Sequence, residues 1–366
     1  MKRIITLVLL ITFVIAGCDS SKDSKEEAKK DNYRGKAANE TITADISKVK
    51  TELSYDEEAW KKEPLYGKEI TIGYNGGLCT STPALAAVKG FFEEEGLSVK
   101  VINVQSEKES VGTDKVQIAT GHIASYLVPT IKGIDMVFIS GAHTGCKSLY
   151  TLKNSKFNST KDLIGHKIGL PNGIGNSDHN ISLRFLNHDN IEPEKVKFVP
   201  VENSASVLAL QKGEIQAALL SDQFAQKFVD DGTLQMIRSI TFDADFKDET
   251  CCIHAFSGKF LRENPITALK ATKAIKKCAF WIEDNKEEAV KLLYDNNWAS
   301  GDVALANYIM STYNFKLQDS TTENTLKNVI ADYIKFGIID VPDETPEQLL
   351  KRVWKPIAAD FDPDKK

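Results

Sequence analysis

The cysteines are the residues of this chain whose type and spacing point most directly to chemistry. The sequence contains Cys18, Cys79, Cys146, the adjacent pair Cys251 and Cys252, and Cys278. Thiolates bind soft metal ions, whereas paired thiols outside the cytoplasm form disulfides and isolated ones often pack in cores. The elements that position each cysteine therefore decide which chemistry applies.

The N-terminal residues predict a separate role for Cys18. Lys2 and Arg3 precede the apolar run IITLVLLITFVIA, which is too short for an ordinary membrane span, and small residues stand directly before Cys18. This arrangement resembles the lipobox of bacterial lipoproteins, which implies a signal peptide over 1–17 and a lipid on Cys18. An uncleaved signal anchor is the alternative. The polar segment that follows, 18–64, buries little and predicts a flexible tether.

Beyond Pro64 the sequence alternates between strand and helix patterns. The segment 65–165 contains four short strand patterns with helices between them. One of these helices is expected from Thr82 to Phe92, because Thr-Pro favours a helix start. Strands that alternate with helices predict an α/β fold with a largely parallel sheet.

The strand and helix pattern restarts at residue 166 and predicts a second, smaller α/β lobe over 166–245. The strand pattern CCIHAFS then returns the chain to the first lobe, and the rest of 246–366 is mostly helical. We therefore expect two lobes, with the C-terminal helices packed on the first. A cleft between two lobes is the usual place for a small-molecule site.

Several segments in a fixed order resemble one protein family. These are STPALAAVKGFFEEEGLSV, VQIATGHIASYLVP, KDLIGHKIGLPNGIGNSDH, ALQKGEIQAALLSD and GKFLRENP. Together they resemble the solute-binding proteins of bacterial ABC importers, in the branch for nitrate, sulfonates, taurine and thiamine precursors. The resemblance implies a two-lobed, periplasmic-binding-protein-like clamp of type II that closes on a small molecule and delivers it to permease and ATPase subunits. With the lipobox, it implies an extracytoplasmic protein anchored by its lipid to the bacterial cell membrane.

Cysteines stand where ordinary members of this family have hydroxyl, amide or basic side chains. Cys79 follows the first strand and Cys146 the fourth, and open α/β sheets bind ligands beyond such strand ends. Cys251 and Cys252 are adjacent on one strand and should point to opposite faces, so we expect one of them to face the cleft. Cys278 lies on an amphipathic helix and is expected to be a core thiol.

Two or three thiolates without a carboxylate cluster suit a soft, low-coordinate species. Cys79 directly precedes a helix, and a helix N-terminus should lower the pKa of its thiol. Cys79, Cys146 and Cys252 are therefore the candidate metal ligands if the bound molecule contains a metal. A Cys79–Cys146 disulfide, a vicinal Cys251–Cys252 bridge and inert buried thiols remain alternatives.

Other candidate ligand contacts surround these cysteines. The loop before a helix that begins near Ser177 offers backbone N–H groups to the far side of the ligand, and this contact would drive closure of the lobes. His143 and His254 lie near cysteines, His122 lies near a helix start, and Asp222 stands where the family often faces its cleft. The full set of candidate ligand-binding residues is Cys79, Thr80, Ser81, His122, His143, Cys146, Gly175, Asn176, Ser177, Asp222, Cys251 and Cys252.

The CC and GC pairs, in this family setting, resemble the binding component of the selenocysteine-assisted organometal importers. This resemblance implies a thiophilic, organometal-type ligand held by cysteines in the cleft. The alternative is a conventional binding protein for a sulfonate, taurine, nitrate or pyrimidine precursor, with structural cysteines. No cofactor is expected with either ligand.

Enzymatic activity and nucleic-acid binding are not expected. The sequence contains no H-E-x-x-H, G-x-S-x-G or C-x-x-C motif. Eukaryotic relatives of the thiamine-precursor branch use a cysteine-rich motif to make the pyrimidine, but this chain offers only Cys251-Cys252, and its lipobox places it outside the cytoplasm. The net charge of -5 and pI of about 5.8 give no footprint for nucleic acid.

Overall fold

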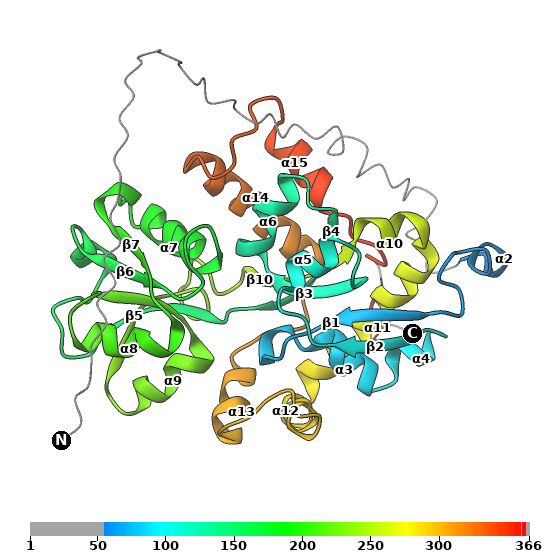
Figure 1. Ribbon diagram of the computed structural model, residues 1–366, viewed down its shortest axis with the longest axis horizontal. Coiled ribbons are helices and arrows are strands. Elements are labelled where there is room, and N and C mark those ends of the chain that lie inside the picture. The colour runs from blue at the N-terminus through cyan, green and yellow to red at the C-terminus, as the bar shows by residue number, and fades with distance from the viewer. Residues whose placement is uncertain (1–54, 360, 364–366) are drawn as a thin grey trace, which may run out of the picture. The chain divides into compact units, whose positions relative to one another are not determined.

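The structure, a computed structural model, describes residues 55–359 and 361–363 (Figure 1). The expected signal peptide, the expected lipidation site Cys18 and most of the expected tether lie outside these residues. Among the helices that are described, none is both long enough and apolar enough to span a membrane.

Five strands form the first sheet in the spatial order β2 (Ser98–Ile102), β1 (Glu69–Gly73), β3 (Ile118–His122), β10 (Thr250–Ser257) and β4 (Met136–Thr144). β1 pairs in parallel with β2 and β3. β10 runs antiparallel between β3 and β4, so the other four strands share one direction. We call the part of the chain built on this sheet lobe 1.

Five further strands form a second sheet in the spatial order β7 (Lys197–Pro200), β6 (Lys167–Leu170), β8 (Ala217–Ser221), β5 (Lys147–Leu152) and β9 (Leu234–Ser239). β6 is parallel to β7 and β8, whereas β5 is antiparallel to β8 and β9. We call this part lobe 2. The expected α/β fold is confirmed, with two mixed sheets that each contain one antiparallel strand.

The second sheet begins at Lys147, earlier than the boundary expected between residues 165 and 166. β5 follows β4 after only two residues, Gly145 and Cys146. A lysine at the start of the segment KSLYTL is not typical of a fully buried strand. Lys147 is buried nonetheless, because its ammonium group pairs with the Asp178 carboxylate at 2.6 Å.

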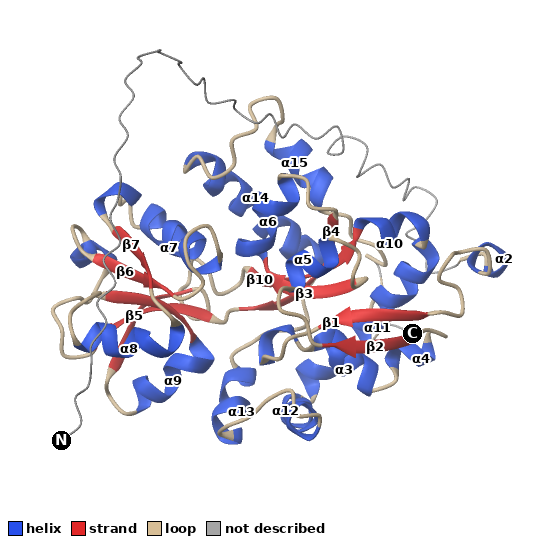
Figure 2. Cartoon of the chain, viewed as in Figure 1, coloured by secondary structure: helices blue, strands red, loops and turns tan. Residues whose placement is uncertain are grey.

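Helices cover both faces of each sheet (Figure 2). Lobe 2 carries α7 (Ser177–His188), α8 (Asn203–Gln211) and α9 (Asp222–Asp230). Lobe 1 carries α3 (Thr82–Val88), α4 (Phe91–Glu94), α5 (Glu107–Gly112), α6 (Ile123–Ile131), α10 (Gly258–Glu263), α11 (Pro265–Asp284), α12 (Lys286–Asp295), α13 (Val303–Ser311), α14 (Asp319–Lys335) and α15 (Pro346–Val353). The single helix expected from Thr82 to Phe92 is split, because Gly90 adopts a left-handed φ of 77° between α3 and α4.

Successive side chains of β4 point to opposite faces of the first sheet, so each face packs into a different core. Val137 and Ile139 join the core that contains α3 and α11, whereas Met136 and Phe138 join the core formed with α6, α14 and α15. The C-terminal helices α14 and α15 therefore pack on lobe 1, as the sequence predicts.

The folded part begins before Pro64, in the segment expected to be tether. Trp60, at the end of the short helix α2 (Glu57–Trp60), is buried and its indole N–H donates to Thr267 Oγ1 at 3.0 Å. The Glu63 carboxylate accepts hydrogen bonds from the backbone N–H groups of Ile266 and Thr267, at 2.6 and 2.9 Å. These donors belong to the first turn of α11, so Glu63 caps that helix and holds the preceding residues against it.

Two connections join the lobes. The first is Gly145–Cys146, between β4 and β5, and the second is 240–249, between β9 and β10. The backbone N–H of Cys146 donates to Thr241 Oγ1 at 2.8 Å, which links the first connection to the second. The two connections therefore form one hydrogen-bonded unit.

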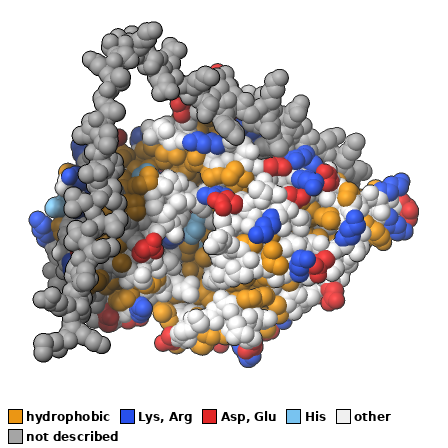
Figure 3. Space-filling view, viewed as in Figure 1, with side chains coloured by type: hydrophobic (Ala, Val, Ile, Leu, Met, Phe, Trp, Pro, Cys, Tyr) orange, Lys and Arg blue, Asp and Glu red, His pale blue; other side chains and the backbone are white. Residues whose placement is uncertain are grey.

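Surface charges of both signs are mixed. Figure 3 shows one face of the protein, on which Lys and Arg side chains are interspersed with Asp and Glu. Several form exposed pairs, such as Lys100 with Glu69 at 2.7 Å and Lys89 with Glu288 at 3.0 Å. Pairs of this kind contribute about 0–1 kcal/mol each, so the stability of the fold comes mainly from its buried contacts.

Candidate functional site

A cleft of about 420 Å³ is lined by residues of both lobes. Cys79 and Thr80, in the turn after β1, and His122, at the end of β3, lie on the lobe 1 side. Asn176 and Ser177, at the start of α7, lie on the lobe 2 side. The structure therefore brings together two regions that the sequence predicts to face one cleft, the end of strand one and the loop before α7.

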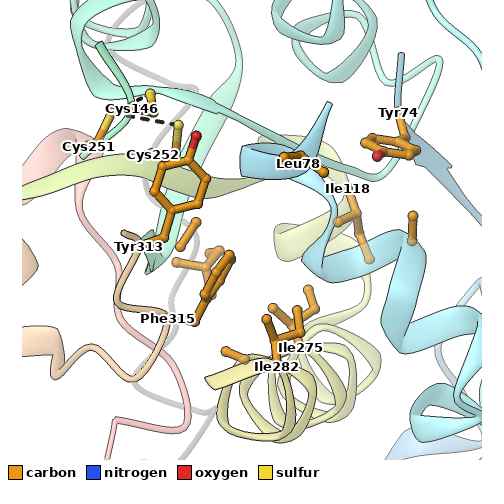
Figure 4. Packing of buried hydrophobic residues seen from close by; sticks show 14 of the residues in the cluster. Tyr74, Leu78, Ile118, Cys146, Cys251, Cys252, Ile275, Ile282, Tyr313 and Phe315 are labelled. Atoms are coloured by element: carbon orange, nitrogen blue, oxygen red, sulfur yellow. Dashed lines mark hydrogen bonds between the residues drawn. The ribbon is translucent and has the colours of Figure 1, made fainter. Parts of the chain in front are cut away.

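Four side chains meet beside this cleft and could hold one metal ion: His122, Cys146, Cys251 and Cys252, whose ligand atoms all lie within 4.8 Å of one another. The Cys146 and Cys251 sulfurs are 3.2 Å apart, and those of Cys251 and Cys252 are 4.0 Å apart. His122 Nδ1 lies 3.3 Å from the Cys251 sulfur and 3.9 Å from that of Cys146. Figure 4 shows the three sulfurs together, with Tyr313 next to them.

A second group shares one of these cysteines. Cys79, His143 and Cys252 also place their ligand atoms within 4.8 Å of one another. His143 Nδ1 lies 2.7 Å from the Thr144 carbonyl oxygen, and because a carbonyl only accepts, Nδ1 carries the proton. Burial lowers the pKa of the His143 ring, but Cys79 and Cys146 outweigh burial and raise that pKa, so the ring interacts with these sulfurs.

We expected one of Cys251 and Cys252 to face the cleft, but neither lines it, and both belong to the first group. Regular alternation would place the two side chains on opposite faces of β10. The pairing of β10 with β4 is irregular between Thr250 and Cys252 and again between Cys252 and Ile253. Such irregularities re-aim side chains, and they are common next to functional sites.

The backbone of Cys146 is strained. Its φ of 116° lies in the left-handed region that favours glycine, and Gly145 before it has a φ of 78°. Cys146 is held there from both sides, because its N–H donates to Thr241 and its carbonyl accepts from the N–H of Asp222 at 3.0 Å. The fold thus keeps a thiol at a position where glycine would be more stable.

Replacing Cys146 with glycine is expected to stabilise the protein, whereas replacing it with alanine is not. Both substitutions remove the thiol, but only glycine relieves the positive φ, a difference of about 1 kcal/mol in the free energy of unfolding. Urea denaturation of the two variants measures this difference directly. Equal stability of the glycine and alanine variants would contradict the strain.

The thiols of the first group differ in acidity. Burial and the hydrogen bond to Cys251 raise the pKa of Cys146, but hydrogen bonds from Cys252 and Cys79 outweigh them and bring it to about 6. Burial also raises the pKa of Cys251, yet hydrogen bonds from the neighbouring cysteines and the charge of His122 hold it well below its usual range. Burial raises the pKa of Cys252 well above its usual range. The group therefore combines ionised and protonated sulfurs in one buried place.

His122 responds to these thiolates. Burial lowers the pKa of its imidazole, but the negative charges of Cys146 and Cys251 outweigh burial and raise that pKa well above its usual value. A positive imidazolium beside thiolates is the arrangement that keeps cysteine sulfurs ionised in other thiol sites. In this structure the charge of His122 helps to keep the Cys251 thiol ionised.

Seven of the twelve candidate site residues do not line the cleft: Ser81, His143, Cys146, Gly175, Asp222, Cys251 and Cys252. His143 and the three cysteines belong to the two groups described above. Ser81 is buried and donates to the Leu78 carbonyl at 2.8 Å, so its hydroxyl satisfies the turn before α3. Gly175 lies outside the cleft lining, and its N–H donates to His179 Nδ1 at 3.3 Å. Asp222 is buried and accepts hydrogen bonds from the Tyr150 and Thr241 hydroxyls, so it positions the threonine that holds Cys146.

Two further residues noted from the sequence, His254 and Cys278, make contacts outside the two ligand groups. His254 contacts Thr120 Oγ1 at 2.8 Å through Nδ1, and burial lowers its pKa to about 3. It belongs to neither of the two groups of candidate metal ligands. Cys278 is fully buried in the core beside α3, as the sequence predicts.

The family of the chain can be assigned once this geometry is known. A family model described as "NMT1/THI5 like" matches residues 81–289, which is more than half of the 366 residues. The chain belongs to the NMT1/THI5-like family. No curated protein matches its sequence.

Solved structures share the fold of this NMT1/THI5-like chain at low sequence identity. The periplasmic aliphatic sulphonate binding protein SsuA of Escherichia coli matches with a TM-score of 0.63 and 14% identity, over 79% of this chain and 92% of that one. A zinc-bound ligand binding component of an ABC-type import system from Staphylococcus aureus matches with 0.62 and 13%, over 80% and 98%. The desulfurization enzyme DszB matches with 0.55 and 12%, over 80% and 97%. At these identities the matches show a common fold.

Sequence reasoning missed several residues that shape the site of this NMT1/THI5-like chain. Tyr313 and Phe315 pack against the His143 ring, with ring centroids 4.7 and 5.5 Å away. They lie after α13, far from the cysteines in sequence, and no local pattern marks them. Asp178 was also missed, although its place in the first turn of α7 suggests a charge partner.

The buried pair of Lys147 and Asp178 should make the protein sensitive to acid. Burial alone raises the pKa of Asp178, but the charge and hydrogen bond of Lys147 and hydrogen bonds from Asn172 outweigh it and hold that pKa below its usual range. The stabilisation is therefore fully present above the unfolded pKa of about 3.9 and is lost as the pH falls through the lower folded pKa.

Asp178→Asn is expected to lower the free energy of unfolding by about 3 kcal/mol at pH 7, because it leaves Lys147 buried without its counter-charge. It should also reduce the loss of stability as the pH falls from about 4 to about 2. Urea denaturation across this pH range measures both effects. Glu58→Gln, which removes an exposed pair with Lys61, is the control and should change little. An acid profile identical to that of the native chain would count against the role of Asp178.

Proposed function

We propose that this chain is the extracytoplasmic, lipid-anchored substrate-binding protein of an ABC importer, and that its ligand is a thiophilic, organometal-type small molecule. The observation that carries the ligand class is the gathering of four cysteine sulfurs and two imidazoles beside the cleft between the lobes. Permease and ATPase subunits are its partners, and the lipid on Cys18 attaches it to the membrane. The protein binds and releases its ligand without catalysis.

The fold and family support the binding role. Two lobes joined by two connections can open and close around a ligand, as hinged binding proteins do. The chain shares this fold with the sulphonate-binding protein of E. coli and the import component of S. aureus. The match to DszB shows that the same fold also carries an enzyme, so the fold alone does not decide the activity.

The sulfurs of the thiol site favour a soft metal centre over a sulfonate or nitrate anion. Cys146 and Cys251, whose pKa values are lowered, place thiolates behind His122, which lines the cleft. Glu107, whose pKa is raised by burial, and Lys108 also line the cleft, so groups of both charge types are present there. Thiolates prefer soft metal centres, so an organic group bound to such a metal would have its metal on the sulfurs and its organic part in the cleft.

Isothermal titration calorimetry of the reduced chain tests this proposal. Methylmercury is expected to bind stoichiometrically, and Cys79→Ser, which removes a sulfur that lines the cleft, is expected to weaken that binding. Taurine and nitrate are the comparison ligands and are expected to give no comparable heat. Tight taurine or nitrate binding that survives alkylation of the cysteines would overturn the proposal and leave a conventional importer component with structural cysteines.

A further inference from the structure

The thiol site consists of two ligand groups that differ in access. The first group, His122, Cys146, Cys251 and Cys252, has three cysteines that are only 2%, 8% and 0% exposed. The second group contains Cys79, which is partly exposed and lines the cleft. A ligand with an organic group can reach the second group from the cleft, whereas the first group is enclosed and suits a bare ion.

The spacing of the first group fits one four-coordinate ion. Metal–sulfur bonds of about 2.3 Å and metal–nitrogen bonds of about 2.0 Å place neighbouring ligands of a tetrahedral zinc ion about 3.5–3.8 Å apart. Four of the six separations among His122 and the sulfurs of Cys146, Cys251 and Cys252 are 3.2, 3.3, 3.9 and 4.0 Å, and the other two are within 4.8 Å. They lie on both sides of the tetrahedral range, so small side-chain rotations would suffice.

The four ligands come from the places where the chain passes between the lobes. Cys146 lies in the first connection, and Cys251 and Cys252 lie in β10, directly after the second connection. His122 stands at the end of β3, where it pairs in register with Cys252. An ion held by these residues would tie the first connection to β3 and β10 of lobe 1.

We propose that His122, Cys146, Cys251 and Cys252 bind one bare Zn²⁺ ion in a four-coordinate site that ties the first connection to lobe 1. Three sulfurs and one imidazole nitrogen form a ligand set that zinc uses in structural sites. Binding requires thiolates and a neutral imidazole, so the protons that the free ligands carry are released to solvent. The zinc site shares Cys252 with the second group, whereas Cys79 and His143 belong to the second group alone. Only the assignment of the second group to an organometal rests on the proposed function.

Native mass spectrometry and cobalt spectroscopy of the reduced, full-length chain test the site. Zn²⁺ is expected to bind in a 1:1 ratio, and Co²⁺ in its place should give the intense visible bands of a tetrahedral sulfur-ligated ion. Cys146→Ser should abolish both signals. Cys79→Ser should retain the zinc ion while it loses methylmercury affinity, and Cys278→Ser, the matched control, should change neither.

Folding of the variants is tested separately, because a collapsed variant would also lose zinc. Cys146→Gly relieves the strained φ and keeps the fold, so it should lose the ion while circular dichroism stays native. Zn²⁺ should raise the melting temperature of the native chain and leave that of Cys146→Gly unchanged. Retention of zinc by folded Cys146→Gly, a Cys146–Cys251 disulfide in the isolated chain, or octahedral cobalt bands would each overturn the zinc site. Failure of methylmercury to bind the reduced, zinc-free chain would instead overturn the proposed function alone.

Discussion

Replacing Cys252 with serine should remove both zinc and methylmercury binding, the largest loss expected for any single thiol. Cys252 is the one cysteine that belongs to both ligand groups, and it is fully buried on β10. Zinc sites with four protein ligands bind with about 10–16 kcal/mol, or roughly 3 kcal/mol for each ligand, so the loss of one ligand corresponds to about 100-fold in affinity. We expect at least this loss for zinc and a similar one for methylmercury.

Cys278→Ser is the matched control for this prediction. Cys278 is equally buried, but it lies on α11 in the core beside α3 and belongs to neither ligand group. Its replacement should lower stability without changing either affinity. Titrations of both ions into the two variants give the comparison. If Cys252→Ser kept native affinity for either ion, the inference that Cys252 is a ligand in both groups would be wrong.

Arg184→Met should destabilise the protein by about 4–5 kcal/mol, the largest loss of stability expected for a charged residue. Arg184 lies on α7 of lobe 2, and its Nε donates to Asp332 on α14 of lobe 1 at 2.6 Å. Its Nη1 donates to Glu249, in the second connection, also at 2.6 Å. The Arg184 side chain is 8% exposed, so its removal leaves two largely buried carboxylates without their partner.

The pKa of Asp332 also reflects its contact with Arg184. Burial raises the pKa of Asp332, but His188 and Arg184 outweigh it and hold that pKa below its usual range. Arg184→Lys keeps the charge but cannot contact both carboxylates with one planar group, so its stability should fall between those of the native chain and Arg184→Met. Urea denaturation orders the three proteins. A methionine variant as stable as the native chain would show that this network contributes little.

The regular parts of the fold could be predicted from the sequence because they follow local rules. The alternation in β4 marks the two faces of the first sheet, and Cys79 and Cys146 are placed correctly beyond the ends of β1 and β4. The start of α7 at Ser177 also agrees with the sequence. Each of these features depends on residues that are close together in the chain.

The parts that could not be predicted depend on distant partners. β5 could not be predicted because it begins with a lysine, which is rarely buried. Lys147 is buried here because it pairs with Asp178. The bulged pairing of β10 with β4 turns both Cys251 and Cys252 toward one place, and nothing in the letters CCIHAF indicates it. His122 looks like an ordinary residue before a helix, yet the fold brings its ring to 3.3 Å from the sulfur of Cys251, more than a hundred residues away.

Native mass spectrometry of the reduced chain with methylmercury, with taurine as the comparison, shows most directly whether the cysteines bind a thiophilic ligand. We expect a stoichiometric methylmercury adduct that is blocked by prior treatment with iodoacetamide and lost in Cys252→Ser. A chain whose free thiols take up no methylmercury, or one that binds taurine equally well before and after alkylation, would contradict a thiolate site for a thiophilic ligand.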